Sequence, residues 1–132
     1  MSLDVHLVTP EREVWSGEAT MVVARGLEGD VGLLPGHAPM LMPLAIGPLF
    51  IHQESDVVAI AVEGGFLHVT SGGGDSRVDV LAEHAELASE IDLQAARALQ
   101  ADAERRIEER ATDDARADLA RAVTRIRVHP DG

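Results

Sequence analysis

The feature that most constrains the fold is a change of pattern near residue 85. Before it, short apolar runs alternate with turn signals that contain Gly or Pro, and Leu3, Val5 and Leu7 alternate with polar residues as in a half-buried strand. After it, the composition shifts to Ala, Arg, Glu and Leu. Many short strands at close spacing, with no helical pattern between them, indicate an antiparallel sandwich or a flattened barrel.

The second part of the chain predicts two helices. Asp92 is a suitable N-cap, because its carboxylate can accept hydrogen bonds from the free N–H groups of a helix start. Apolar residues recur at helical spacing on both sides of a break at residues 111–114: Ala96, Leu99, Ala103 and Ile107, then Ala115, Leu119, Ala122, Val123 and Ile126. A buried Ala contributes far less than the ~1.5–3 kcal/mol of a Leu or Ile. We therefore expect a weakly held antiparallel hairpin over residues 87–132, after a sandwich over residues 1–86.

Charge narrows the choice of partners. The net charge is −12, and all eleven basic residues are Arg. Such an acidic chain is not expected to bind nucleic acid, which requires neutralisation of phosphates, but it suits a basic or loop-rich protein partner. No stretch approaches the roughly 20 apolar residues that span a bilayer, so membrane association is expected only through partners.

The sequence offers no recognisable catalytic or metal site. It has no Cys, its six His are scattered with no pair at a metal-ligand spacing, and no Ser lies in a G-x-S-x-G motif. Without any Lys it cannot form a Gly-Lys-Ser/Thr phosphate loop. The prediction is a binding or structural module without catalytic residues or a metal.

Four motifs resemble one known family. The segment EGDVGLLPGHAP (residues 28–39) is similar to the signature of the epsilon subunit of F-type ATP synthases. Three further segments resemble the same family: LDVHLVTPEREVWSGEA at residues 3–19, AVEGGFLHV at 61–69 and VDVLAEHAELASEID at 78–92. The motifs occur in the family's order and cover nearly the whole chain. The resemblance implies a β-sandwich of about ten antiparallel strands followed by a C-terminal antiparallel α-helical hairpin.

The resemblance also implies a place in a complex. The sandwich is expected to bind the gamma subunit and the c-ring at the foot of the rotating central stalk, on the cytoplasmic face of the bacterial cell membrane. The hairpin is expected to restrain ATP hydrolysis when it extends into the catalytic alpha/beta hexamer. The rigid, Gly- and Pro-rich loop is a good recognition surface. We predict that Glu28, Asp30 and His37 in it contact the c-ring or gamma.

Some family members bind ATP in the hairpin, and this chain matches their motif only in part. Ile91 and Asp92 match its start, and Arg121 and Arg125 match two of its cationic positions at an i, i+4 spacing. The other two cationic positions hold Ala95 and Asp102. Weak or absent ATP binding is therefore expected, and no cofactor.

Two alternative functions require features that this sequence lacks. A free-standing ATP-sensing sandwich and hairpin protein would need the two missing cationic positions. A sandwich enzyme or carbohydrate-binding module would need aromatic platforms or a carboxylate pair, and the chain has only Trp15, Phe50 and Phe66 as aromatic residues.

Overall fold

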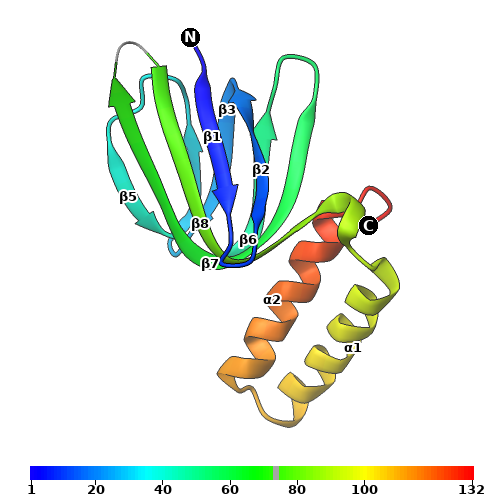
Figure 1. Cartoon of the computed structure of the whole chain (residues 1–132). Helices are drawn as coiled ribbons and strands as arrows, with labels where there is room; N and C mark the ends of the chain where they lie inside the picture. The colour runs from blue at the N-terminus through cyan, green and yellow to red at the C-terminus, as the bar shows by residue number, and fades with distance from the viewer. Residues whose placement is uncertain (73–74) are drawn as a thin grey trace.

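The computed structural model describes residues 1–72 and 75–132 as a part made of strands followed by two helices, which project from one end of the strands (Figure 1). The strands are β1 (Leu3–Val8), β2 (Glu13–Ala19), β3 (Met21–Gly26), β4 (Gly29–Leu33), β5 (Met40–Pro43), β6 (Ile46–His52), β7 (Val57–Gly72) and β8 (Asp75–Leu87). A 3-10 turn η1 (Ala88–Glu90), then α1 (Leu93–Glu109) and α2 (Asp113–Val128), complete the chain.

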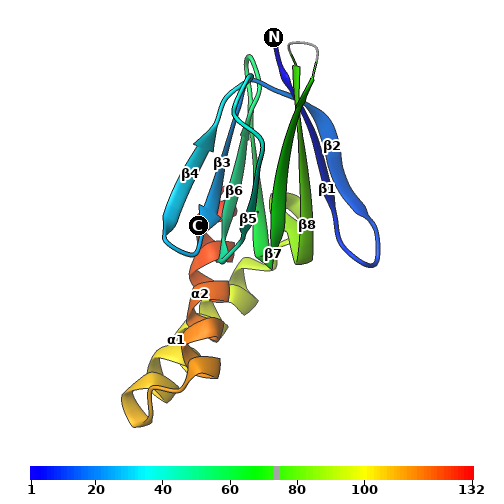
Figure 2. The ribbon, with the colours of Figure 1, turned by 90° about the vertical axis from the view of Figure 1, so that its left-hand side faces the viewer.

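Two long strands each serve both layers of the sandwich. On one edge, β7 pairs with β6 through residues 57–63 and with β5 through residues 66–69. On its other edge, β7 pairs with β8 along both of these halves. The bend lies at Gly64 and Gly65, whose φ angles are +68° and +103°. A Cβ at Gly65 would lie 2.0 Å from the carbonyl oxygen of Leu81, so no other residue fits there. In the view of Figure 2 the strands separate into two layers, one with β4, β3 and β6 and the other with β2, β1 and β8.

The predicted fold class is confirmed, with two differences in detail. The described residues form eight strands where about ten are predicted, and one reason is that residues 57–72 form the single long strand β7. Gly64-Gly65 bends this strand and does not end it. One strand pair, β1 with β8, is parallel. The run Gly72-Gly73-Gly74 in the sequence predicts a hairpin turn, and residues 73 and 74 lie outside the described residues.

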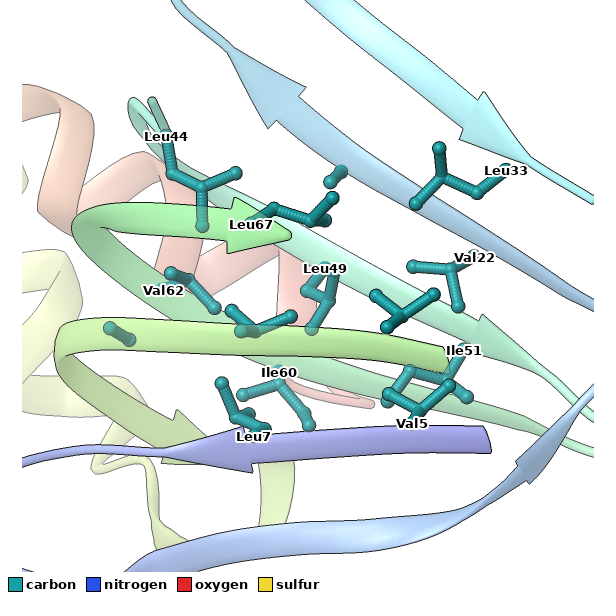
Figure 3. Close-up of a cluster of buried hydrophobic side chains, with 14 of the residues drawn as sticks. Val5, Leu7, Val22, Leu33, Leu44, Leu49, Ile51, Ile60, Val62 and Leu67 are labelled. Carbon is teal, nitrogen blue, oxygen red and sulfur yellow. The ribbon is translucent and has the colours of Figure 1, made fainter. Parts of the chain in front are cut away.

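The core lies between the two layers. Alternate residues of each strand point inward, among them Leu7 of β1, Leu49 of β6, and Ile60 and Leu67 of β7 (Figure 3). Each of these four side chains is at most 2% exposed. The main cluster is built from strand and loop residues of the first 87, so the helices add nothing to it.

The hairpin has capped helices and a small-residue seam, as predicted. Asp92 accepts a hydrogen bond from the amide of Ala95 at 3.0 Å, and Thr112 accepts one from Ala115 at 3.1 Å. The buried residues along the two helices include Ala96, Ala103, Ala115 and Ala122. Among the described residues, no helix combines the length and apolar character needed to cross a membrane.

Candidate functional site: the contact between α2 and the sandwich

The apolar part of the contact between α2 and the sandwich is small. It consists of Ala61 of β7, Ile91 before α1 and Val128 at the end of α2, with Ala59 and Ala88 packed at its edge. Three of these five residues are Ala, so little apolar area is removed from water. Apolar burial alone therefore holds α2 weakly.

Charged side chains add to the contact, and one of them, Arg127, lies over the ring of Phe50 in β6, 5.2 Å from its centroid. Arg121 donates from Nε to Oε1 of Glu63 at 2.7 Å, and Arg125 donates from Nη2 to Oε2 of the same carboxylate. Arg125 also donates from Nε to Oε1 of Glu86 at 2.6 Å. The side chains of Glu63 and Arg125 are only 17% and 20% exposed. Pairs of this kind are screened less by salt than fully exposed ones.

Strand register brings the two glutamates together. Glu63 lies directly opposite His84 in the β7–β8 pair, and Glu86 lies two residues beyond His84 on the same face of β8. The resulting group of two carboxylates and one imidazole faces α2.

The ion pairs continue from α2 to α1. Arg121 donates to Asp118 at 2.9 Å, Asp118 accepts from Arg106 at 2.9 Å, and Arg106 donates to Asp102 at 3.0 Å. The hydrogen bond from Arg106 is the main cause that lowers the pKa of Asp118, and the bond to Glu63 is the main cause that raises the pKa of Arg121. We call this series the ion-pair chain; its members are Asp102, Arg106, Asp118, Arg121, Glu63, Arg125 and Glu86.

The same carboxylates could hold a cation. Ligand atoms of Glu63, His84 and Glu86 lie within 4.8 Å of one another, the spacing of a possible metal site in the described part of the chain. Both carboxylates already accept hydrogen bonds from guanidinium groups. In this structure the protein's own arginines serve as the cations.

A second surface feature lies on the outside of the sandwich, across β5, β7 and β8. Leu41, Phe66 and Leu81 are 66%, 51% and 55% exposed, and they come from the neighbouring strands β5, β7 and β8. Phe66 and Leu81 are direct cross-strand partners. We call these three residues the apolar strip. A groove beside it is lined by Pro10, Gly65 and Ala82, among others. Contiguous exposed apolar side chains of this size mark interaction surfaces.

Known proteins match both the sandwich and the hairpin of this chain. The family model described as ATP synthase, Delta/Epsilon chain, beta-sandwich domain matches residues 2–88. The ATP synthase epsilon chain of Thermobifida fusca is 48% identical over 129 residues, which cover 96% of this chain and 90% of that protein. The epsilon chain of Streptomyces coelicolor is 45% identical over 128 residues, with 96% and 94% covered.

The chain belongs to the ATP synthase epsilon chain family. The resemblance drawn from the four motifs is thereby confirmed. These relatives are named as a subunit of ATP synthase, and their names indicate no catalytic activity of their own.

Two solved structures share the fold of this epsilon-family chain. One is a chain from the Euglena gracilis mitochondrial ATP synthase, OSCP/F1/c-ring in rotational state 1, with a TM-score of 0.74 and 23% identity over 95% of this chain and 78% of that one. The other is from the Tetrahymena thermophila mitochondrial ATP synthase central stalk/c-ring, with a TM-score of 0.53 and 21% identity over 68% and 69%. The first likeness extends over sandwich and hairpin together.

The structure gathers part of the predicted nucleotide motif of this epsilon-family chain. Arg121 and Arg125 lie together on α2, and Ile91 is buried in the nearby apolar contact at 6% exposure. The carboxylate of Asp92 is engaged as the cap of α1. Asp102 is paired with Arg105 and Arg106, at the far end of the ion-pair chain.

The sequence pattern did not predict Glu63 and Glu86, the glutamates that accept hydrogen bonds from these arginines. Glu63 follows a strand run and precedes Gly64-Gly65, so it reads as a turn residue. The spacing of His84 and Glu86 places them on one strand face, which is the only local signal. Recognition of Glu63 as their neighbour requires the register of β7 with β8.

The three residues predicted to contact partners do not lie together. Glu28 is exposed in the turn before β4, and Asp30 within β4 accepts from Arg25 at 2.5 Å. His37 lies in the loop after β4, so this strand separates it from Glu28 (Figure 2). That loop is tied to β8 by a hydrogen bond from the amide of Gly36 to Ser76 at 2.9 Å.

Proposed function

We propose that the chain is a non-catalytic central-stalk subunit of a bacterial F-type ATP synthase that helps couple proton translocation to ATP synthesis. The observation that carries this proposal is the match over nearly the full length of epsilon chains, which includes both the sandwich and the hairpin. The partners proposed for the sandwich are the gamma subunit and the c-ring, and the complex would hold the chain at the cytoplasmic face of the membrane.

The sandwich has separate surfaces for two such partners. The apolar strip of Leu41, Phe66 and Leu81 suits a stable, partly apolar contact, which we assign to gamma. Glu28 and Asp30 lie at one end of β4 and His37 beyond the other, so we propose that they contact different partners. The end with Glu28 and Asp30 is assigned to the c-ring loops.

The hairpin is proposed to restrain ATP hydrolysis by leaving the sandwich and extending into the alpha/beta hexamer. Its thin apolar contact and its hydrogen-bonded ion pairs support this role. Carboxylates and guanidinium groups are well hydrated when separated, so an ion-paired contact opens at lower cost than a large apolar one. Weak or absent ATP binding remains part of the proposal.

Hydrolysis by the F1 complex tests this function. F1 from the same organism would be prepared without this chain, and the full chain or residues 1–88 would be added back. We expect the full chain to lower the rate of ATP hydrolysis and residues 1–88 to bind without lowering it. Equal rates with both chains would contradict the role of the hairpin, and failure of both to bind would contradict the assignment to the stalk.

A further inference from the structure

Arg121 and Arg125 form a two-arginine cluster on one face of α2. Their i, i+4 spacing places them one turn apart, and both guanidinium groups point at the same carboxylate, that of Glu63. A guanidinium fork matches a carboxylate and a phosphate equally well. The cluster therefore has the chemistry of a site for an oxyanion.

Glu63 occupies this cluster in a bridging manner. Its Oε1 accepts from Arg121 and its Oε2 accepts from Arg125, so each oxygen serves one arginine. A phosphate group placed between the arginines would need the same two donors. The Glu63 side chain is only 17% exposed and lies between β7 and the two arginines of α2.

We propose that Glu63 is the resident anion of this two-arginine site, so that an oligophosphate can bind only by displacing it. The docked state of the hairpin would then need no bound nucleotide, because the protein supplies the negative charge itself. This inference rests on the proposed weak nucleotide binding. It attributes the weak binding to Glu63, in addition to the loss of two cationic positions at Ala95 and Asp102.

The test removes the charge of Glu63 and keeps its shape. Glu63→Gln and the wild-type full chain would be titrated with sodium triphosphate and, separately, with ATP by calorimetry at low salt. Glu28→Gln is the matched control, since it changes the net charge by the same amount at an exposed turn. We expect E63Q to bind both probes at least about tenfold more tightly than the wild type and E28Q. The added change Arg121→Gln should abolish this gain.

Hydrogen exchange gives a second measurement if E63Q loosens the hairpin. The amides of α2 should then exchange faster in E63Q, and triphosphate should restore their protection by taking the vacated place. A variant that undocks without recovery, or that binds no more tightly than E28Q, would overturn the proposal.

Two further results would also contradict it. Wild-type affinity equal to that of E63Q would show that Glu63 does not compete. A gain for ATP without one for triphosphate would assign recognition to the base or sugar and not to the phosphate chain. All of these measurements use the isolated full chain, so their failure is distinguishable from failure of the stalk assignment, which requires F1.

Discussion

The carboxylate of Glu63 in β7 accepts a hydrogen bond from the guanidinium of Arg121 in α2 at 2.7 Å, although 58 positions separate the two residues. Arg125, one helical turn on, donates to the same carboxylate. Because the buried apolar cluster beside them has five members and three of these are Ala, these bonds contribute substantially to the docking of the hairpin. One carboxylate of the sandwich thus accepts hydrogen bonds from two arginines of α2.

Glu63→Gln is expected to loosen α2 without unfolding the sandwich. Hydrogen bonds to charged groups contribute about 1.5–3 kcal/mol each, and a partly exposed site retains about 1–2 kcal/mol of this. Hydrogen exchange of α2 amides should therefore be about 5- to 30-fold faster than in the wild type, while β6 amides stay protected. Glu28→Gln serves as the control, and equal α2 protection in both variants would contradict the role of Glu63.

Gly65→Ala is expected to destabilise the sandwich by about 3 kcal/mol or more, because it forces a side chain into a strained φ and against the backbone of β8. Gly32→Ala is the matched control, since a Cβ there meets nothing within 4 Å and its φ is not in the strained range. Urea unfolding followed by circular dichroism compares the two. Similar midpoints for both variants would show that the bend in β7 tolerates a side chain.

Acid should weaken the hairpin first. The pKa of Asp118 is lowered mainly by its hydrogen bond from Arg106, and the pKa of Asp102 is lowered mainly by Arg106 and then by Arg105. A lowered folded-state pKa means that this stabilisation is complete above the ordinary pKa of an aspartate, about 3.9, and is lost as the pH falls through the lower folded value. Unfolding measured from pH 6 to pH 2 should show this loss.

Asp118→Asn should reduce that pH dependence, because it removes one of the groups responsible. Glu54→Gln, at an exposed turn position, should leave it unchanged. If Asp118→Asn and Glu54→Gln both lose stability with acid in the same way as the wild type, the ion-pair chain makes no measurable contribution to the pH dependence of stability.

Leu81→Glu is expected to weaken binding to gamma, because it places a charge in the apolar strip directly opposite Phe66. Val57→Glu changes a similarly exposed residue, 49% against 55%, at the start of β7. We expect at least about a tenfold loss of affinity for L81E and little change for V57E, as measured by surface plasmon resonance. Equal losses would indicate a general effect of charge.

Much of this fold can be predicted from local patterns. Alternation in β1, the N-cap at Asp92 and the Ala-rich helix faces each depend on residues close together in sequence. The continuity of β7 was not predictable in this way, since Gly64-Gly65 is a common turn signal and becomes a bend only because β8 pairs along both halves. The parallel pairing of β1 with β8 likewise joins segments about 70 residues apart.

The site was predictable only on its helical side. Arg121 and Arg125 are visible as an i, i+4 pair, whereas their anion comes from a strand that the sequence does not place beside them. Asp30 and Arg25 differ in this respect, because they lie five positions apart and pair across the turn of the β3–β4 hairpin. Partners brought together by tertiary structure leave no local signal.

Binding of the chain to the gamma subunit of the same organism tests its assignment to the central stalk. Purified gamma would be captured with the full chain and with residues 1–88 at low and moderate salt. We expect both to retain gamma with similar affinity, because the sandwich carries the contact and the hairpin does not. Absence of binding by either chain under both conditions would contradict the assignment to the central stalk.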